Sequence, residues 1–217
     1  MSKKKGINIL KKNEIIDEFL QILPSYSSKN INSRPDSEQA LHKMYEDYTD
    51  PIISFAKNLT SDNIFFLSNE VRAMFGHIAE YRLDGKKKNL EDAYGHFRRL
   101  NIDMFKVLCN EFDKTFLKYL KKHYHYDFRD VHSSFLKDYA QLYFDAKNTY
   151  LEAQLKEHVG SDRLSGNVIE LYYNATVKYS ELLKYFRENH KGIEKQKISF
   201  IISIVCSTIF SIIGLFV

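Results

Sequence analysis

Residues 89–124 read NLEDAYGHFRRLNIDMFKVLCNEFDKTFLKYLKKHY, and this stretch decides the fold. Apolar side chains recur in it every three or four residues, which is the period of an α-helix with one buried face. Asn89 is a favourable N-cap residue, and Asp92 stands at the capping-box position. The pattern predicts one long helix from Asn89 to about Tyr124. Its apolar face comprises Leu90, Ala93, Phe97, Leu100, Met104, Val107, Leu108, Phe112, Phe116 and Tyr119.

Upstream of this stretch, three further helices are predicted. The first begins near residue 13 and stops at Pro24, because proline does not continue a helix. Ser37 is expected to cap the second, which either kinks or divides at Pro51. The third opens at Asp62 and ends near Gly85, before a short basic turn. A turn this short implies that the third helix and the long helix form an antiparallel hairpin.

Downstream, a fifth helix is predicted over residues 128–146 with a break at residues 158–161, and a sixth begins near residue 167. The chain of 217 residues contains only 8 glycines and 3 prolines, and no segment alternates as a strand does. We therefore expect an all-α fold, an antiparallel helical bundle over residues 13–190. The formal net charge of +4 is a mild excess and does not by itself indicate nucleic-acid binding.

Residues 198–217, ISFIISIVCSTIFSIIGLFV, contain no charged side chain. A helix of this length extends about 30 Å, which matches the hydrocarbon core of a bilayer. Residues 191–197 form a basic juxtamembrane join with three lysines, a charge that favours the cytoplasmic side. Residues 1–12 are a basic N-terminal arm without the apolar region of a signal peptide. We therefore expect one C-terminal transmembrane helix, a single pass through the inner cell membrane and a cytoplasmic bundle. The alternative is a buried core helix.

Small residues recur within this apolar segment at helical spacing. They are Ser199, Ser203, Ser207, Ser211 and Gly214. Residues four apart lie on one helix face, and small residues there allow two membrane helices to approach closely. The stripe is therefore interpreted as a surface for helix packing or as the lining of a narrow pore. The alternative is a chance spacing, because a serine hydroxyl in a membrane helix can bond its own backbone.

The hairpin places several polar side chains at one height. His77 and His96 are equally far in sequence from the basic turn, so they are expected to be level with each other. Each follows a glycine, and we expect Gly76 and Gly95 to mark a close approach of the two backbones. The expected polar cluster contains Arg72, His77, Glu80, His96, Arg99 and Asp103.

Two interpretations of this cluster remain open from the sequence. In one it is a structural network, in which Arg72 pairs with Asp103 and His77 pairs with Glu80. In the other it is an acid–base or phosphate-handling site, because histidine titrates near neutral pH and arginine grips phosphate.

The segment Arg72-Ala-Met-Phe-Gly-His77 resembles the Arg-x4–6-His signature of the HEPN superfamily, and the surrounding NEVRAMFGHIAEY resembles its motif helix. The resemblance implies a small helical bundle whose Arg72 and His77 meet those of a second protomer. Such a site cleaves RNA without a metal ion, with the 2′-hydroxyl as the nucleophile. The sequence departs from the family pattern at Ala73, where a polar residue is usual. A HEPN-like body joined to a membrane helix is similar to the membrane pore accessories of type VI-B CRISPR systems.

Three functional hypotheses follow. The first is a homo-oligomeric effector of a prokaryotic antiphage defence system, which perturbs or permeabilises the lipid bilayer when a partner protein triggers it. The second is a membrane-tethered, metal-independent ribonuclease that acts through Arg72 and His77. The third is a non-enzymatic membrane adaptor. No cofactor is expected, and no metal site either, since His123 and His125 point in different directions on a helix. Cys109 and Cys206 fall in different elements and are not expected to bridge.

Overall fold

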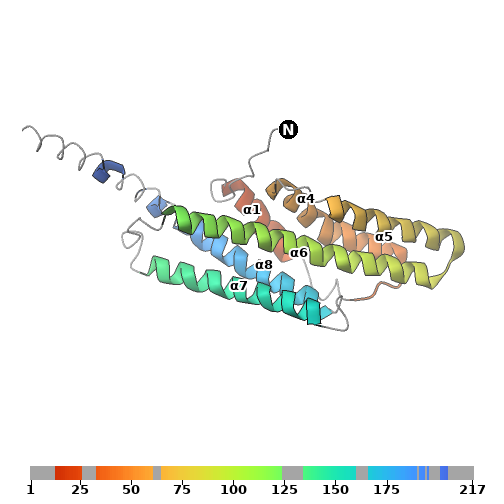
Figure 1. Ribbon diagram of the computed structural model, residues 1–217. Helices are drawn as coiled ribbons and strands as arrows, with labels where there is room; N and C mark the ends of the chain where they lie inside the picture. Colours follow the sequence, from red (N-terminus) through yellow and green to blue (C-terminus); the bar gives the residue numbers. More distant parts are fainter. Residues whose placement is uncertain are drawn as a thin grey trace, which may run out of the picture.

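The computed structural model describes residues 13–25, 33–60, 65–123, 134–159, 166–189, 191–193, 195 and 201–204. Within these ranges all the regular structure is helical, so the expected all-α bundle is confirmed (Figure 1). Its elements are α1 (Asn13–Ile22), η2 (Leu23–Ser25), α3 (Glu38–Met44), η3 (Tyr45–Thr49), α4 (Asp50–Leu59), α5 (Phe65–Asp84), α6 (Lys87–His123), α7 (Phe135–Val159) and α8 (Gly166–Glu188).

Helix α6 is the central element of the bundle. It has 37 residues without a break, which corresponds to about 55 Å of helix. Helix α5 packs antiparallel along its first half, and α8 packs along its second half (Figure 1). Helix α7 packs chiefly on α8 and lies at the edge of the bundle. The long amphipathic pattern of residues 89–124 therefore corresponds to a helix that contacts both halves of the molecule.

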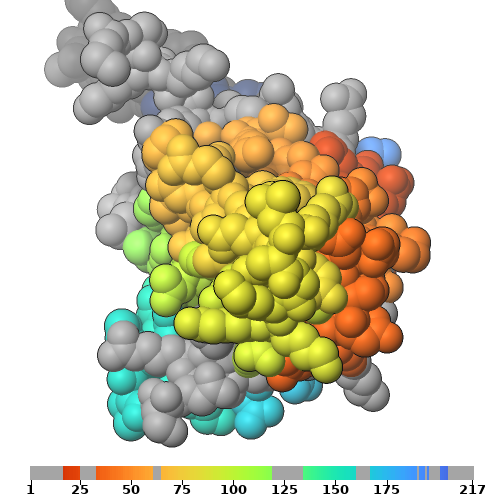
Figure 2. Space-filling view, turned by 90° about the vertical axis from the view of Figure 1, so that its right-hand side faces the viewer, coloured from red at the N-terminus to blue at the C-terminus, as the bar shows by residue number. Residues whose placement is uncertain are grey.

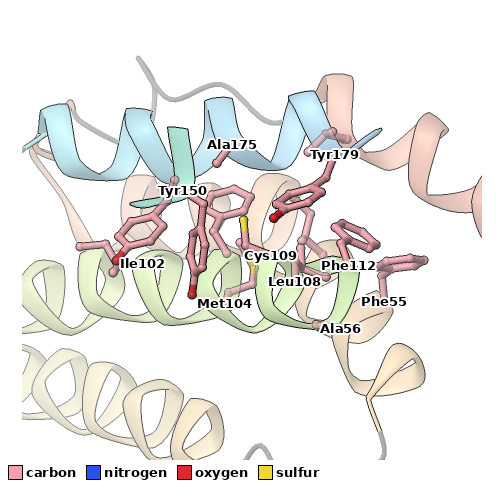
Figure 3. Packing of buried hydrophobic residues seen from close by; sticks show 14 of the residues in the cluster. Phe55, Ala56, Ile102, Met104, Leu108, Cys109, Phe112, Tyr150, Ala175 and Tyr179 are labelled. Atoms are coloured by element: carbon pink, nitrogen blue, oxygen red, sulfur yellow. The ribbon is translucent and has the colours of Figure 1, made fainter. Parts of the chain in front are cut away.

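Aromatic side chains fill the centre of the core. The ring of Phe19 stacks on that of Phe55 with centroids 4.7 Å apart and meets the edge of the Phe112 ring at 5.2 Å. Phe112 in turn lies 5.9 Å from the ring of Tyr179. These four fully buried side chains come from α1, α4, α6 and α8, so one aromatic cluster joins four helices. Figure 3 shows three of them, Phe55, Phe112 and Tyr179.

Helix α7 is connected to α6 mainly by long polar side chains. Asp113 of α6 accepts hydrogen bonds from the ammonium of Lys147 at 2.6 Å and from the hydroxyl of Tyr143 at 2.8 Å. Tyr179 of α8 donates to the same carboxylate at 3.3 Å. A charged acceptor with an ammonium and two phenolic donors is well satisfied, and it ties the three helices together at one level.

The chain between Ser37 and Thr60 kinks without dividing. Ser37 caps α3 as expected, because its hydroxyl accepts a hydrogen bond from the backbone of Ala40. The helix then passes through the π-helical turn η3 into α4, with Pro51 in the first turn of α4. Proline lacks the backbone donor of a regular helix, and a π turn is a common way to accommodate such an interruption. The kink brings buried Thr49 within 3.0 Å of Asn101 on α6.

The turn between α5 and α6 differs in detail from the expectation. Helix α6 begins at Lys87, so Asn89 lies inside the helix and the prediction that it is the N-cap was wrong. The carboxylate of Asp84 instead accepts from the backbone of Lys86 at 2.9 Å and from the Asn89 side chain at 3.1 Å. Gly85 has a φ of 67°, the left-handed conformation that glycine adopts without strain.

Ion pairs attach the tip of this hairpin to the segment around α3. Arg82 donates to Glu38 at 2.8 Å, and Arg34 pairs with Glu91. Figure 2 views the molecule from this side, with the hairpin tip in yellow and the segment around α3 in orange beside it. All four side chains are solvent-accessible to some degree, so the contact adds orientation more than stability.

Several expectations lie partly or wholly outside the described residues. Helix α7 ends at Val159 as predicted, whereas residues 128–133 of the expected fifth helix are outside. The arm 1–12 and most of the segment 198–217 are outside as well, including Ser199, Cys206, Ser207, Ser211 and Gly214. Among the helices that the structure describes, none combines the length and the apolarity needed to cross a bilayer.

The expected close approach at Gly76 and Gly95 was wrong. A methyl group built at either glycine would meet no other atom within 4 Å. Both glycines lie in the interior of helices, where glycine is less favourable than alanine because of its greater backbone freedom.

We therefore expect Gly76→Ala and Gly95→Ala each to raise the free energy of unfolding by about 0.5 to 1 kcal/mol, measured by urea denaturation of the full-length chain in mild detergent. Gly85→Ala is the matched control and should lower it, because alanine is strained at a φ of 67°. Destabilisation by either helical substitution would show that the glycines are needed for a contact in the bundle.

Candidate functional site

The two histidines of the hairpin stack on each other. The rings of His77 on α5 and His96 on α6 have centroids 5.3 Å apart and planes that differ by 18°. The prediction that they lie at one height is confirmed. Both side chains are half-buried, so each ring packs against the hairpin and still has an edge accessible to solvent.

Each ring also contacts a carboxylate through its Nδ1 atom. Nδ1 of His77 lies 3.0 Å from an oxygen of Glu80, one turn later on α5, as predicted. Nδ1 of His96 lies 2.7 Å from an oxygen of Glu70, which is also on α5. The result is a row in which carboxylate, imidazole, imidazole and carboxylate follow one another across the hairpin.

A second set of polar contacts crosses the bundle through α6, α7 and α8. The negative charge of Glu70 acts to raise the pKa of Asp103, whose carboxylate is 3.6 Å from the ammonium of Lys106. Lys106 donates to Glu157 on α7 at 2.5 Å, and the hydroxyl of Tyr172 on α8 donates to the other oxygen of Glu157 at 2.6 Å. Polar contacts from Asp103 to Tyr172 therefore join α6, α7 and α8, and Glu70 of α5 influences this set through its charge.

The electrostatics of this network differ from one carboxylate to the next. Burial raises the pKa of Asp103, the negative charges of Glu70 and Glu157 raise it further, and the nearby Lys106 opposes the change. Burial also acts to raise the pKa of Glu157, but the hydrogen bonds from Lys106 and Tyr172 outweigh it and lower the pKa below its ordinary value. Lys106 is therefore held mainly by Glu157, and Asp103 is the weaker partner.

The arginines of the expected cluster do not join it. Arg72 is exposed and donates to Asn69 at 3.2 Å, three residues earlier on the same helix. The predicted pair between Arg72 and Asp103 was therefore wrong. Five residues turn a helix by about 140°, so Arg72 points to a different side of α5 from His77. Arg99 is also exposed on α6.

The stacked pair has the groups needed for proton exchange. A carboxylate at Nδ1 orients an imidazole and fixes which nitrogen carries a proton, so Nε2 is the atom that can exchange one with an external group. Phosphate binding would need cations close by, and within one chain Arg72 is directed away from the rings. Among the described residues no group of three or more metal-binding side chains occurs, and residue 125 lies outside them.

Sequence reasoning missed Glu70 and the Lys106–Glu157–Tyr172 chain. Glu70 had a usable signal, since it stands seven residues before His77 and therefore on the same face of α5. The other three come from α6, α7 and α8, and no local spacing connects them. Only the packing of α7 and α8 against α6 brings them together.

Comparison of the chain with models of protein families, with curated proteins and with solved structures finds no match.

The raised pKa of Asp103 predicts how stability depends on pH. Folding favours the protonated carboxyl, so this residue's unfavourable contribution is absent below the ordinary pKa of 3.8 and grows as the pH rises through the folded-state pKa. We expect Asp103→Asn to raise the free energy of unfolding at pH 7, with a gain that shrinks towards pH 4. Urea denaturation over this range measures it. Asp36→Asn, at an exposed position, is the control; an equal gain for both variants at every pH would contradict the assignment.

Proposed function

We propose that this protein is a membrane-anchored, oligomeric helical effector of a prokaryotic antiphage defence system. In this proposal residues 198–217 form a single transmembrane helix, the bundle lies on the cytoplasmic side of the inner membrane, and activation perturbs or permeabilises the bilayer. The bundle is the part that oligomerises and meets a triggering partner. The role is non-enzymatic.

The anchor rests on the chemistry of its sequence. Twenty residues without a charge suffice to cross the hydrocarbon core, and transfer of their side chains from water to lipid is favourable. Lys191 and Lys195 precede the segment and are exposed, as juxtamembrane lysines near lipid headgroups would be.

One structural observation carries the proposal. Residues Ile201–Ile204 are helical and lie away from the bundle (Figure 1). Their three isoleucines are 56%, 56% and 50% exposed. The core of the bundle is filled by residues 19–193, so these isoleucines are not needed to complete it. Large aliphatic side chains left in water on a helix favour a second apolar phase, and a bilayer supplies one.

The defence setting is supported by the resemblance of residues 69–81 to the HEPN motif helix. A HEPN-like body joined to a membrane helix is similar to the pore accessories of type VI-B CRISPR systems. The all-helical bundle agrees with a HEPN-like body, and Arg72 turned away from His77 agrees with a degenerate site better than with an active one.

We expect the full-length chain to float with liposomes in a density gradient and to resist extraction at alkaline pH, because a spanning helix is buried in hydrocarbon. A chain that stops at Lys197 should remain in the aqueous fraction, and it is the matched control. The proposal fails if the full-length chain is monodisperse in detergent-free buffer and stays out of the liposome fraction.

The permeabilising step is tested in cells with a dye that reports membrane potential. Activation should collapse the potential, and Ser203→Leu with Ser207→Leu should protect it by removing the small-residue surface of the helix. If the membrane potential persists on activation of the unaltered chain, the permeabilising role is wrong and the adaptor hypothesis replaces it.

A second candidate, the membrane-tethered ribonuclease, is favoured by one observation. Arg72 is exposed and His77 is partly accessible on another side of α5, so in this hypothesis a second protomer supplies the Arg72 that faces His77. That arrangement is the one the HEPN resemblance implies.

Toxicity on expression separates the two candidates. If the effector proposal holds, the double variant Arg72→Ala with His77→Ala stays toxic and truncation before Ile198 abolishes toxicity. If the ribonuclease holds, the two results are reversed, and cleaved RNA appears only with the intact pair. Arg99→Ala is the control for loss of an exposed arginine from the same hairpin.

A further inference from the structure

Helix α7 is apolar on two different faces. One face is buried against the bundle through Phe135, Tyr139, Tyr143, Ala146, Tyr150 and Ala153. Helix α7 lies at the edge of the bundle (Figure 1), and side chains on its other face are exposed to solvent. Five large apolar side chains on it are exposed, Leu136 at 48%, Phe144 at 57%, Leu151 at 42%, Leu155 at 65% and Val159 at 84%. With the small, half-buried Ala140 they form what we call the outer stripe.

The spacing between the members of the outer stripe is the same from either end. The gaps between its six members are four, four, seven, four and four residues. Its centre therefore falls between Lys147 and Asn148. Gaps of four and seven keep all the members on one side of a helix. A symmetric row of this kind is self-complementary when two copies lie antiparallel, because a two-fold axis through the centre faces each member with another member.

We propose that α7 forms an antiparallel homodimer contact with α7 of a second copy of this chain, with the two-fold axis beside Asn148. The amide of Asn148, exposed at the middle of the stripe, hydrogen-bonds the same amide across the axis. This dimer depends on the bundle alone and does not require membrane insertion. The facing pairs across the contact are Phe144 with Leu151, Ala140 with Leu155, and Leu136 with Val159.

The side chains in these pairs are complementary in size. Ala140 has only a methyl group, so it leaves space for the longer side chain of Leu155 from the other copy. Leu155 is 65% exposed, so it projects far enough from its own bundle to fill that space. A large side chain opposite a small one lets two helices interlock without a void or a clash.

The charges around the stripe favour a second copy over a lipid surface. Helix α7 has two exposed lysines, Lys137 and Lys156, and two exposed acidic residues, Asp145 and Glu152. A helix that lies on an anionic membrane carries an excess of cations on its polar face. Balanced charge beside an apolar row is instead typical of helix–helix contacts.

The size of the stripe sets the strength of the contact. Its length from residue 136 to residue 159 is about 35 Å, and at about 10 Å wide it covers roughly 350 Å² per copy. That area is below the usual value of about 800 Å² per partner, so the dimer is weak and reversible in solution. A shared membrane raises the effective concentration of the bundles and strengthens it.

Disulfide trapping tests both the contact and its direction. The full-length chain carrying Cys206→Ser is purified in detergent as Phe144→Cys, as Leu151→Cys, and as an equal mixture of the two. Each is oxidised at pH 8. Cys109 does not interfere, because burial raises the pKa of its thiol to about 12. Phe144 and Leu151 are both exposed, so neither substitution disturbs the core.

The antiparallel dimer predicts that the mixture gives several-fold more disulfide-linked dimer than either variant alone. Directly facing thiols are within bonding reach, whereas identical positions are about 10 Å apart along the axis, beyond the usual limit of about 7 Å between Cα atoms. Leu83→Cys, at an 88% exposed position on α5, measures disulfides from random collision.

Each other outcome overturns the proposal. Cross-linking of the single variants above the Leu83→Cys level indicates parallel packing. Equal, low cross-linking in all samples means that the stripe has another occupant. As an independent check, adding Leu155→Glu to both members of the mixture should reduce the trapped dimer to the collision level; a trapped dimer that persists would contradict the contact. Because the experiment is done in detergent, its failure leaves the liposome result for the membrane anchor unaffected.

Discussion

The fold depends on the burial of one continuous face of α6. Helix α6 packs against both α5 and α8, and its apolar positions from Leu90 to Phe116 are almost completely removed from water except for the partly buried Val107. An isolated helix gains little from its own hydrogen bonds, so α6 is held by tertiary packing along its whole length. A break in its middle would separate the two halves of the core. The low glycine and proline content of the chain is consistent with this constraint.

The hydrophobic periodicity was sufficient to predict the bundle, because helix packing depends on which face is apolar and hardly on side-chain detail. The sequence also placed His77 beside His96, because two residues equally far from the turn of a helical hairpin lie at the same height along it. It failed where a side chain had a choice of partners. Arg72 hydrogen-bonds the nearby Asn69 instead of Asp103, and His96 hydrogen-bonds Glu70. Such choices depend on rotamers and on local exposure, which spacing does not encode. The prediction of a close backbone approach at Gly76 and Gly95 was wrong because glycine can occur inside a helix without a neighbouring backbone that requires it.

The polar network and the position of α7 are connected. Helix α7 packs less closely on α6 than on α8, and Lys106 with Glu157 and Lys147 with Asp113 join it to α6 beside the ring contact of Phe116 with Tyr139. Long side chains with charged ends can bridge such a separation and still satisfy one another, which short aliphatic chains cannot. The same separation leaves α7 anchored mainly through α8, at the edge of the bundle. An edge helix has a second face, and in this chain that face is apolar.

Exposed large apolar side chains gather in the outer stripe of α7, and the described residues 201–204 of the apolar C-terminal segment carry three more. Neither the outer stripe nor residues 201–204 belong to the core of the described bundle. Exposure of large aliphatic side chains to water is unfavourable in proportion to their area, by about 25 cal/mol per Å². A protein that kept both surfaces in water would bear that penalty for no gain in stability. The two surfaces differ in chemistry, since one has charges along its borders and the other has none within it. A bordered apolar row is typical of helix–helix contacts and an uncharged segment is typical of lipid contacts, so in the arrangement that we propose the two surfaces have separate roles.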